Sequence, residues 1–227
     1  MIDGIAGSGK TTVIQAMFEA LVAQGLRCVR LQDWKDDHPP TLDELQDFDV
    51  LFSFEPTKSW VGSALRSEMF HEPAYSGVSH AYAFALDREI QYRRLILPAL
   101  EAGKMVIQDR GVSSSLVYQP ILPNTLSVEE IATLPGNQLA LKHAPDHLIL
   151  TRIAPEQIVE RIAKRTDDSK GMYGELELMR KVDARFREPW FRAYFETHGT
   201  RIHTLDTGGT LNESQANAVH LITRLIA

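Results

Sequence analysis

Residues 4–11 read GIAGSGKT, which matches the pattern GxxxxGK[ST] at every fixed position. Glycines at this spacing let successive backbone N–H groups turn inward around an anion, and a helix that begins here adds the positive end of its dipole. In such a loop Lys10 reaches the β- and γ-phosphates of a nucleotide, and the Thr11 hydroxyl ligates magnesium. The segment therefore predicts a site for ATP and Mg²⁺, formed by Gly4, Gly7, Ser8, Gly9, Lys10, Thr11 and Thr12.

Only Met1, Ile2 and Asp3 precede this loop. A phosphate loop should follow a strand, and a central strand usually has about five residues. We therefore expect either a very short first strand or a chain that is truncated relative to the working protein.

The elements that must position this loop alternate along the chain. Short β-like runs occupy 27–31, 48–54, 104–108, 146–151 and 201–205. Helical spacing of apolar residues occupies 10–22, about 61–70, about 79–102, 155–165, 174–195 and 212–226. This alternation predicts an α/β fold with a mostly parallel sheet of about five strands. The proline-containing stretch 120–137 is expected to be a surface excursion.

Composition limits the class of protein. The chain has 227 residues, 44% of them hydrophobic, which is enough for one substantial core, so we expect a single domain over 1–227. The net charge of −6 would repel DNA or RNA, and no apolar run approaches the roughly 20 residues that span a bilayer. Cys28 is the only cysteine, so a reducing, cytoplasmic location is expected.

Four further segments carry side chains suited to chemistry: 55–66 (EPTKSWVGSALR), 84–88 (FALDR), 109–119 (DRGVSSSLVYQ) and 161–186. Together with DGIAGSGKTT they resemble the thymidylate kinase family, in the same order and at comparable spacing over nearly the whole chain. The resemblance implies a P-loop NTPase-type three-layer sandwich with a small helical lid at about 161–174. It also implies small nucleotide substrates and a homodimer, for which the apolar helix 79–102 could serve.

Asp109 and Arg110 end the predicted strand 104–108, at the edge of a parallel sheet where ligands bind. The resemblance implies that Arg110 holds the acceptor phosphate and that Asp109 helps to organise magnesium and the acceptor. The alternative is a surface ion pair, which would contribute little.

Phe84 and Arg88 are four residues apart on a predicted helix, so both project from one face. The resemblance implies that Phe84 stacks on a thymine ring and that Arg88 donates to its carbonyl edge. The alternative places Phe84 in the core and Arg88 in solvent.

Other acceptor-side residues follow from the same resemblance. It implies that Ser115, with Ser114, lies beside the base, that Tyr118 lies near the sugar, and that Arg66 approaches the acceptor phosphate in a loop with Glu55. A serine-rich helix start is equally an N-cap, and a surface role for Arg66 is open.

Arg161 and Arg165 precede a polar stretch, TDDSKG, that contains Lys170. A basic segment of this kind suits a lid that closes on the nucleotide and directs cations at developing charge. Arg165 best matches the lid arginine of the family. Solvated helix ends are the alternative.

The chain departs from the family pattern at Ala6, Phe54, Gly111 and Pro120, all on the acceptor side. The expected reaction is transfer of the ATP γ-phosphate to dTMP, giving dTDP. One rival is a deoxynucleoside kinase, because Glu55, Pro56 and Trp60 also resemble the EPxxxW segment of that family, whose glutamate acts as a base toward a 5′-hydroxyl. The other rival is a nucleotide-binding module without catalysis.

Overall fold

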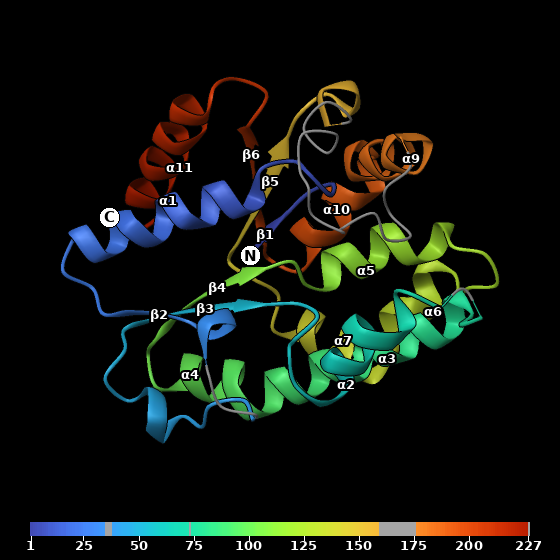
Figure 1. The fold of residues 1–227 in the computed structure, drawn as a ribbon, viewed down its shortest axis with the longest axis horizontal. Helices are drawn as coiled ribbons and strands as arrows, with labels where there is room; N and C mark the ends of the chain where they lie inside the picture. Colours follow the sequence, from blue (N-terminus) through green and yellow to red (C-terminus); the bar gives the residue numbers. More distant parts are fainter. Residues whose placement is uncertain (35–37, 73, 159–175, 227) are drawn as a thin grey trace. The chain divides into compact units, whose positions relative to one another are not determined.

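The computed structural model describes residues 1–227 except 35–37, 73, 159–175 and 227. The chain folds into two compact units (Figure 1). The first unit holds Met1 and Val29–Pro145, and the second holds Ile2–Cys28 and Asp146–Ala227. The lid expected at about 161–174, with Arg161, Arg165 and Lys170, lies outside the described residues. The single-domain organisation stays a prediction.

The strands of the first unit are β2 (Cys28–Arg30), β3 (Val50–Phe54) and β4 (Met105–Asp109), in that order. β3 and β4 are parallel, with Val50 opposite Met105 and Phe54 opposite Asp109. Val50, Leu51 and Phe52 are all buried, as expected for a strand covered on both faces. The carboxyl ends of β3 and β4 therefore meet at one edge, where the Glu55 N–H donates to the Asp109 carbonyl oxygen at 3.0 Å.

The predicted helix 79–102 is one long rod in three parts. α3 (Gly77–Gln91) continues through a π-helical segment, η4 (Tyr92–Ile96), into α4 (Leu97–Glu101). It starts where the Ser76 hydroxyl accepts from the Ser79 N–H. On the core side, Leu95 and Ala99 pack with Leu31, Leu45 and Leu51. The predicted helix 61–70 is α2 (Trp60–Ala64) followed by the π-helical η3 (Leu65–Met69).

The expectation of a surface excursion at 120–137 is wrong. The shorter elements of the first unit are η1 (Leu31–Asp33), η2 (Asp43–Leu45), α5 (Val112–Tyr118), η5 (Gln119–Ile121), α6 (Val128–Thr133) and α7 (Pro135–Lys142). Pro120 and Pro135 stand in the first turns of η5 and α7, where a missing N–H costs nothing. α7 packs along α3, and Ile131 and Asn137 are fully buried.

The second unit contains β1 (Ile2–Asp3), β5 (His147–Arg152) and β6 (Arg201–Asp206), parallel and in that order. β1 has two residues, and it makes six strands among the described residues where about five were expected. α1 (Lys10–Ala23) lies beside α11 (Leu211–Ile226). α11 and α10 (Pro189–Thr197) both contact β6, from opposite sides (Figure 1), so helices cover both faces of a parallel α/β sheet.

The predicted helix 174–195 is two helices, α9 (Leu176–Arg187) and α10. Glu188 between them has an extended backbone, because the residue before a proline, here Pro189, is disfavoured in the helical region.

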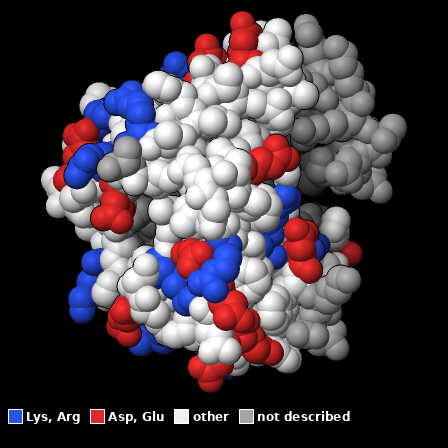
Figure 2. Space-filling view, turned by 90° about the vertical axis from the view of Figure 1, so that its left-hand side faces the viewer, with Lys and Arg blue, Asp and Glu red and all other residues white. Residues whose placement is uncertain are grey.

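No helix in the described part of the chain is long and apolar enough to cross a membrane. On the face drawn in Figure 2, basic and acidic side chains are interspersed rather than gathered by sign.

Candidate active site

The phosphate loop of the second unit has the backbone that its glycines predict. Gly4, Gly7 and Gly9 have φ values of 143°, 78° and 85°, which side chains other than glycine rarely adopt. Gly9 is the N-cap of α1, and neither a side-chain cap nor an acidic residue occupies the first turn of this helix. The N–H groups and positive dipole of that turn therefore suit an anion.

Lys10 lies folded over this loop. Its buried ammonium donates to the carbonyl oxygens of Gly4 at 3.1 Å and Ile5 at 2.8 Å. A lysine held this way faces the interior of the loop, where phosphate oxygens would replace the carbonyls as acceptors.

Two threonines that the sequence analysis missed support the loop. Thr151, at the end of β5, shares a hydrogen bond with the Ser8 hydroxyl at 2.6 Å. Thr207, just after β6, donates to the Ser8 carbonyl oxygen at 2.6 Å. Their place at the carboxyl ends of parallel strands was the one available signal.

The residues present fit ATP and Mg²⁺. The left-handed glycines, the uncapped helix start and Lys10 suit a triphosphate, and Thr11 is exposed in the first turn of α1. The described residues hold no group of three or more His, Cys, Asp or Glu side chains, but Mg²⁺ with nucleotides usually takes only one or two protein ligands besides phosphates and water.

A buried ion pair organises the first unit. The Arg88 Nε donates to the two Glu55 carboxylate oxygens at 3.1 and 3.0 Å, and the Arg88 Nη2 donates to Oε2. Gln108, on β4, donates to Glu55 Oε1 at 2.9 Å. Arg88 is 1% exposed and Glu55 is 6% exposed, so the alternative that placed Arg88 in solvent is wrong.

Arg88 is held from two more elements. Its Nη1 donates to the Asn137 side-chain oxygen on α7, and its Nη2 donates to the Ser115 hydroxyl on α5 at 3.0 Å. Asn137 is fixed in turn by donating to the Ile131 carbonyl oxygen at 2.7 Å. A guanidinium has five N–H groups. These bonds use four of them and leave one on Nη1.

Phe84 is half-buried on α3, one turn before Arg88, and its ring centroid lies 5.9 Å from that of Phe70. This contact neither requires nor excludes a stacked base, so the role of Phe84 stays a prediction.

Arg110 forms a second group at the end of β4. Its Nη1 donates to the Ser114 hydroxyl at 3.0 Å, and its guanidinium carbon lies 5.4 Å from the centre of the Tyr118 ring. Its φ of 66° is rare for a residue other than glycine, and such a conformation costs about 1–3 kcal/mol. The structure thus brings the predicted acceptor residues Arg110, Ser114 and Tyr118 together, and the strained backbone is at Arg110 alone, as is common at functional sites.

Arg66 is tied to the loop after β3. Its Nε donates to the carbonyl oxygens of Pro56 at 2.9 Å and Thr57 at 3.1 Å, and its guanidinium lies 5.3 Å from the Phe54 ring centre. Burial lowers the pKa of Arg66, while the charges of Asp87 and Asp109 raise it. The positive charge of Arg66 therefore lies near the carboxylates of Asp87 and Asp109, at the end of β4.

Asp87 was missed by the sequence analysis and holds the same loop. It accepts from the Thr57 N–H at 2.8 Å and from the Thr57 hydroxyl at 2.6 Å. Burial raises its pKa, and these hydrogen bonds oppose the shift.

Comparison with known proteins identifies the family of the chain. The family model described as thymidylate kinase matches residues 41–217. The chain belongs to the thymidylate kinase family. A kinase of this family is a phosphotransferase, as the resemblance predicted.

Individual relatives agree. A thymidylate kinase of Oceanobacillus iheyensis is 27% identical over 231 residues, covering 99% of this chain and 88% of the relative. A probable thymidylate kinase of Pyrococcus abyssi is 32% identical over 187 residues, covering 80% of this chain and 77% of the relative. The crystal structure of thymidylate kinase from Ehrlichia chaffeensis shares the fold, with a TM-score of 0.63, 19% identity and coverage of 98% and 96%.

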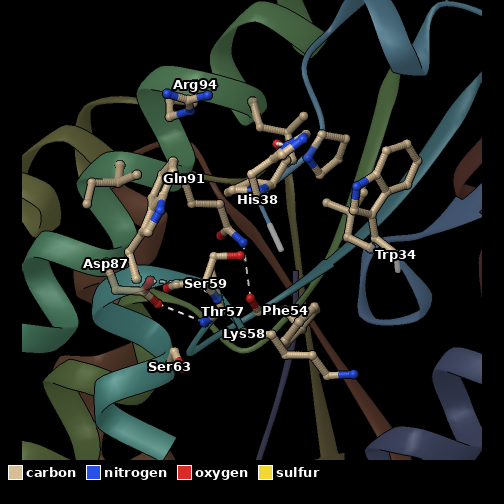
Figure 3. A pocket seen from close by; sticks show the side chains of 16 residues that line it. Trp34, His38, Phe54, Thr57, Lys58, Ser59, Ser63, Asp87, Gln91 and Arg94 are labelled. Atoms are coloured by element: carbon tan, nitrogen blue, oxygen red, sulfur yellow. Dashed lines mark hydrogen bonds between the residues drawn. The ribbon is translucent and has the colours of Figure 1, made fainter. Parts of the chain in front are cut away.

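In this thymidylate kinase family member, Trp60 lies on a cavity that Glu55 does not line. This cavity of about 330 Å³ is in the first unit, and its walls include neither Glu55, Phe84 nor Arg88 (Figure 3). The glutamate and the tryptophan of the EPxxxW pattern therefore do not both line this cavity.

Proposed function

We propose that the chain is a thymidylate kinase that transfers the γ-phosphate of ATP to dTMP, giving dTDP and ADP. The observation that carries this choice of acceptor is the engagement of Glu55. A hydroxyl acceptor needs a general base. Each Glu55 oxygen already accepts two hydrogen bonds, from Arg88 and Gln108, which fills the roughly four lone-pair positions of a carboxylate. A phosphate acceptor is already nucleophilic and needs cations instead.

The proposed catalytic roles are divided among cations. Lys10 contacts the β- and γ-phosphates, Arg110 holds the acceptor phosphate, and Arg165, with Arg161 on the nucleotide, supplies the lid. Mg²⁺, with Thr11 and Asp109 as the proposed protein ligands, would neutralise charge on the phosphates of ATP. Positioning and charge neutralisation supply the catalysis without a covalent enzyme intermediate.

The proposed base site uses the buried network. Phe84 stacks on thymine, and the one remaining N–H of Arg88 donates to a ring carbonyl. Because Glu55, Asn137 and Ser115 fix the guanidinium, its position is set before the nucleotide arrives, which reduces the entropy cost of binding. Tyr118 lies beside the sugar.

We also propose a homodimer that forms through the α3 rod. Tyr82 and Leu86, four residues apart on α3, are 57% and 49% exposed, and Leu100 on α4 is 45% exposed. Three large apolar side chains in solvent along one rod suit a helix-packing interface. The cytoplasmic location stays a prediction, as does the lack of a nucleic-acid partner.

A substrate panel tests the reaction. ADP release from ATP and Mg²⁺ is measured with thymidine and with a set of nucleoside monophosphates that includes dTMP, and with Lys10→Ala as the inactive control. We expect release with dTMP and none with thymidine. Turnover of the nucleoside alone would favour the deoxynucleoside kinase, and no turnover with any monophosphate would favour a binding module.

A further inference from the structure

The cavity of about 330 Å³ in the first unit has aromatic walls. Trp34 follows η1, Phe54 ends β3, and Trp60 begins α2. Figure 3 shows Trp34 on one side of the cavity and Asp87 and Arg94 on the other, with Gln91 between them. Ligand pockets have volumes of about 300–1,000 Å³, so this one suits a small ligand with a flat ring.

The charges at the cavity favour an anion. Lys58 and Arg94 line it, and Asp87 is the only carboxylate among its described lining residues. Both Asp87 oxygens are already engaged by Thr57. The Arg94 guanidinium lies 4.9 Å from the Trp60 ring centre, and within the described ranges no carboxylate pairs with it. A cation stacked on an aromatic wall can meet an anionic group while the ring of the same ligand packs beside it.

No described residue assigned to the reaction lines the cavity, although two of its lining residues, Phe54 and Thr57, contact Arg66. None of residues 4–12 lines it, and neither do Phe84, Arg88 or Arg110. Trp60 is 47% exposed, so a ligand ring would cover apolar surface that now faces solvent. Stacking of a base on an aromatic side chain contributes about 1–3 kcal/mol in other proteins.

We propose that this cavity is a second nucleotide site, which binds a nucleoside monophosphate with its base against the aromatic walls and its phosphate at Arg94. The site goes beyond the proposed reaction, in which dTMP binds beside Phe84 and Arg88. Occupancy would add a ligand to the loop that joins β3 to α2, which also carries Glu55 and Pro56.

The tryptophans allow a direct test. The chain has three, and Trp190 on α10 in the second unit is the only one outside the cavity. In a Trp190→Phe background the emission therefore comes from Trp34 and Trp60, and dTMP is titrated without ATP. We expect a saturable change in emission that persists when Phe84→Ala is added. Arg94→Gln should weaken this binding about tenfold or more, since it removes a charge-assisted bond, and should leave kcat unchanged.

Equilibrium dialysis of the unmodified chain with labelled dTMP provides a second measurement that needs no variant. We expect two dTMP molecules per chain. One per chain would overturn the second site, and so would an emission change that is lost in Phe84→Ala but unaltered by Arg94→Gln. Two bound molecules without any dTDP formation would contradict the proposed reaction and leave the second site standing.

Discussion

At the scale of single residues, the question for the buried pair of Glu55 and Arg88 is whether Glu55 stabilises the fold or acts as a catalytic base. Two charges removed from water lose hydration, and only close, fully hydrogen-bonded geometry compensates for that loss. Gln108, Asn137 and Ser115 complete that geometry around the pair. Removal of one charge would leave the other buried without its counter-ion.

We therefore expect Glu55→Gln to lower the free energy of unfolding by about 3–5 kcal/mol, measured by urea denaturation. Glu89→Gln is the matched control, because Glu89 pairs with Arg93 on the same helix and Arg93 is 63% exposed. That change should stay within about 0.5 kcal/mol. A stable Glu55→Gln protein with a large loss of kcat would instead make Glu55 a catalytic base.

Arg110→Ala tests the acceptor clamp. A cation directed at a transferring phosphate can contribute about 10³–10⁵ in rate, so kcat should fall by about 10³ or more while ATP affinity changes little. Steady-state kinetics and nucleotide titration measure the two effects. The exposed Arg93→Ala should match the unmodified enzyme, and a mild loss of kcat in Arg110→Ala would remove Arg110 from the reaction.

At the scale of elements, the sequence predicted the helices, strands and loops whose conformation depends on neighbouring residues. The phosphate loop, the strands after β1 and the long helices followed from glycine spacing, apolar runs and helical periodicity. The prediction for segment 120–137 was wrong because two of its prolines begin helices. A proline is compatible with a turn and with the first turn of a helix, so the sequence alone could not decide between them. The lid at about 161–174 remains a prediction.

The ion pair between Glu55 and Arg88 could not be predicted from local sequence patterns. Glu55 and Arg88 are 33 residues apart, and Asn137 is 49 beyond Arg88. Nothing periodic links them, because tertiary packing alone brings α3, α7 and the β3–α2 loop together. The resemblance named Glu55 and Arg88 as substrate residues but did not reveal that they bind each other.

Close packing of α7 on α3 gives a prediction for Gly136. A Cβ at this position would overlap the Ala85 carbonyl oxygen, so Gly136→Ala must push the helices apart. We expect a loss of about 1–3 kcal/mol in the free energy of unfolding, with a raised KM for dTMP because Asn137 moves with α7. In the control Gly209→Ala, the atoms nearest to the new methyl group belong to the side chain of Glu213 and not to the backbone of another helix. An unaltered KM in a destabilised Gly136→Ala enzyme would separate α7 from the acceptor site.

At the scale of the whole molecule, stability should depend on a histidine pair in the second unit. His147 Nδ1 and His203 Nε2 are 3.0 Å apart on β5 and β6. Burial lowers the pKa of both below the ordinary 6.5; Arg201 lowers both further, Asp146 opposes the shift at His147, and Arg224 adds to it at His203. The unfolded chain therefore binds more protons, so stability should fall as the pH drops below about 6.5.

Urea denaturation between pH 5 and pH 7.5 measures this dependence. His203→Gln should flatten the slope, because it removes one titrating ring and relieves the other. An unchanged slope would place the acid sensitivity elsewhere.

The proposed homodimer is also a property of the whole molecule. Leu86→Glu places a charge beside the exposed Tyr82 on α3 without altering the core. Sedimentation equilibrium should therefore show a dimer for the unmodified chain and a monomer for the variant. Leu211→Glu, on a residue that is 61% exposed at the start of α11, is the control and should remain dimeric. A monomeric unmodified chain would contradict the interface.

Because Arg88 and Gln108 occupy the Glu55 carboxylate, the acceptor should be a phosphate and not a hydroxyl. One reaction distinguishes the two acceptors: the unmodified chain with ATP, Mg²⁺ and an equimolar mixture of dTMP and isotope-labelled thymidine, with products separated by ion-exchange chromatography. We expect unlabelled dTDP to accumulate while the labelled thymidine remains. Conversion of the labelled thymidine to dTMP, with no dTDP formed, would contradict this expectation.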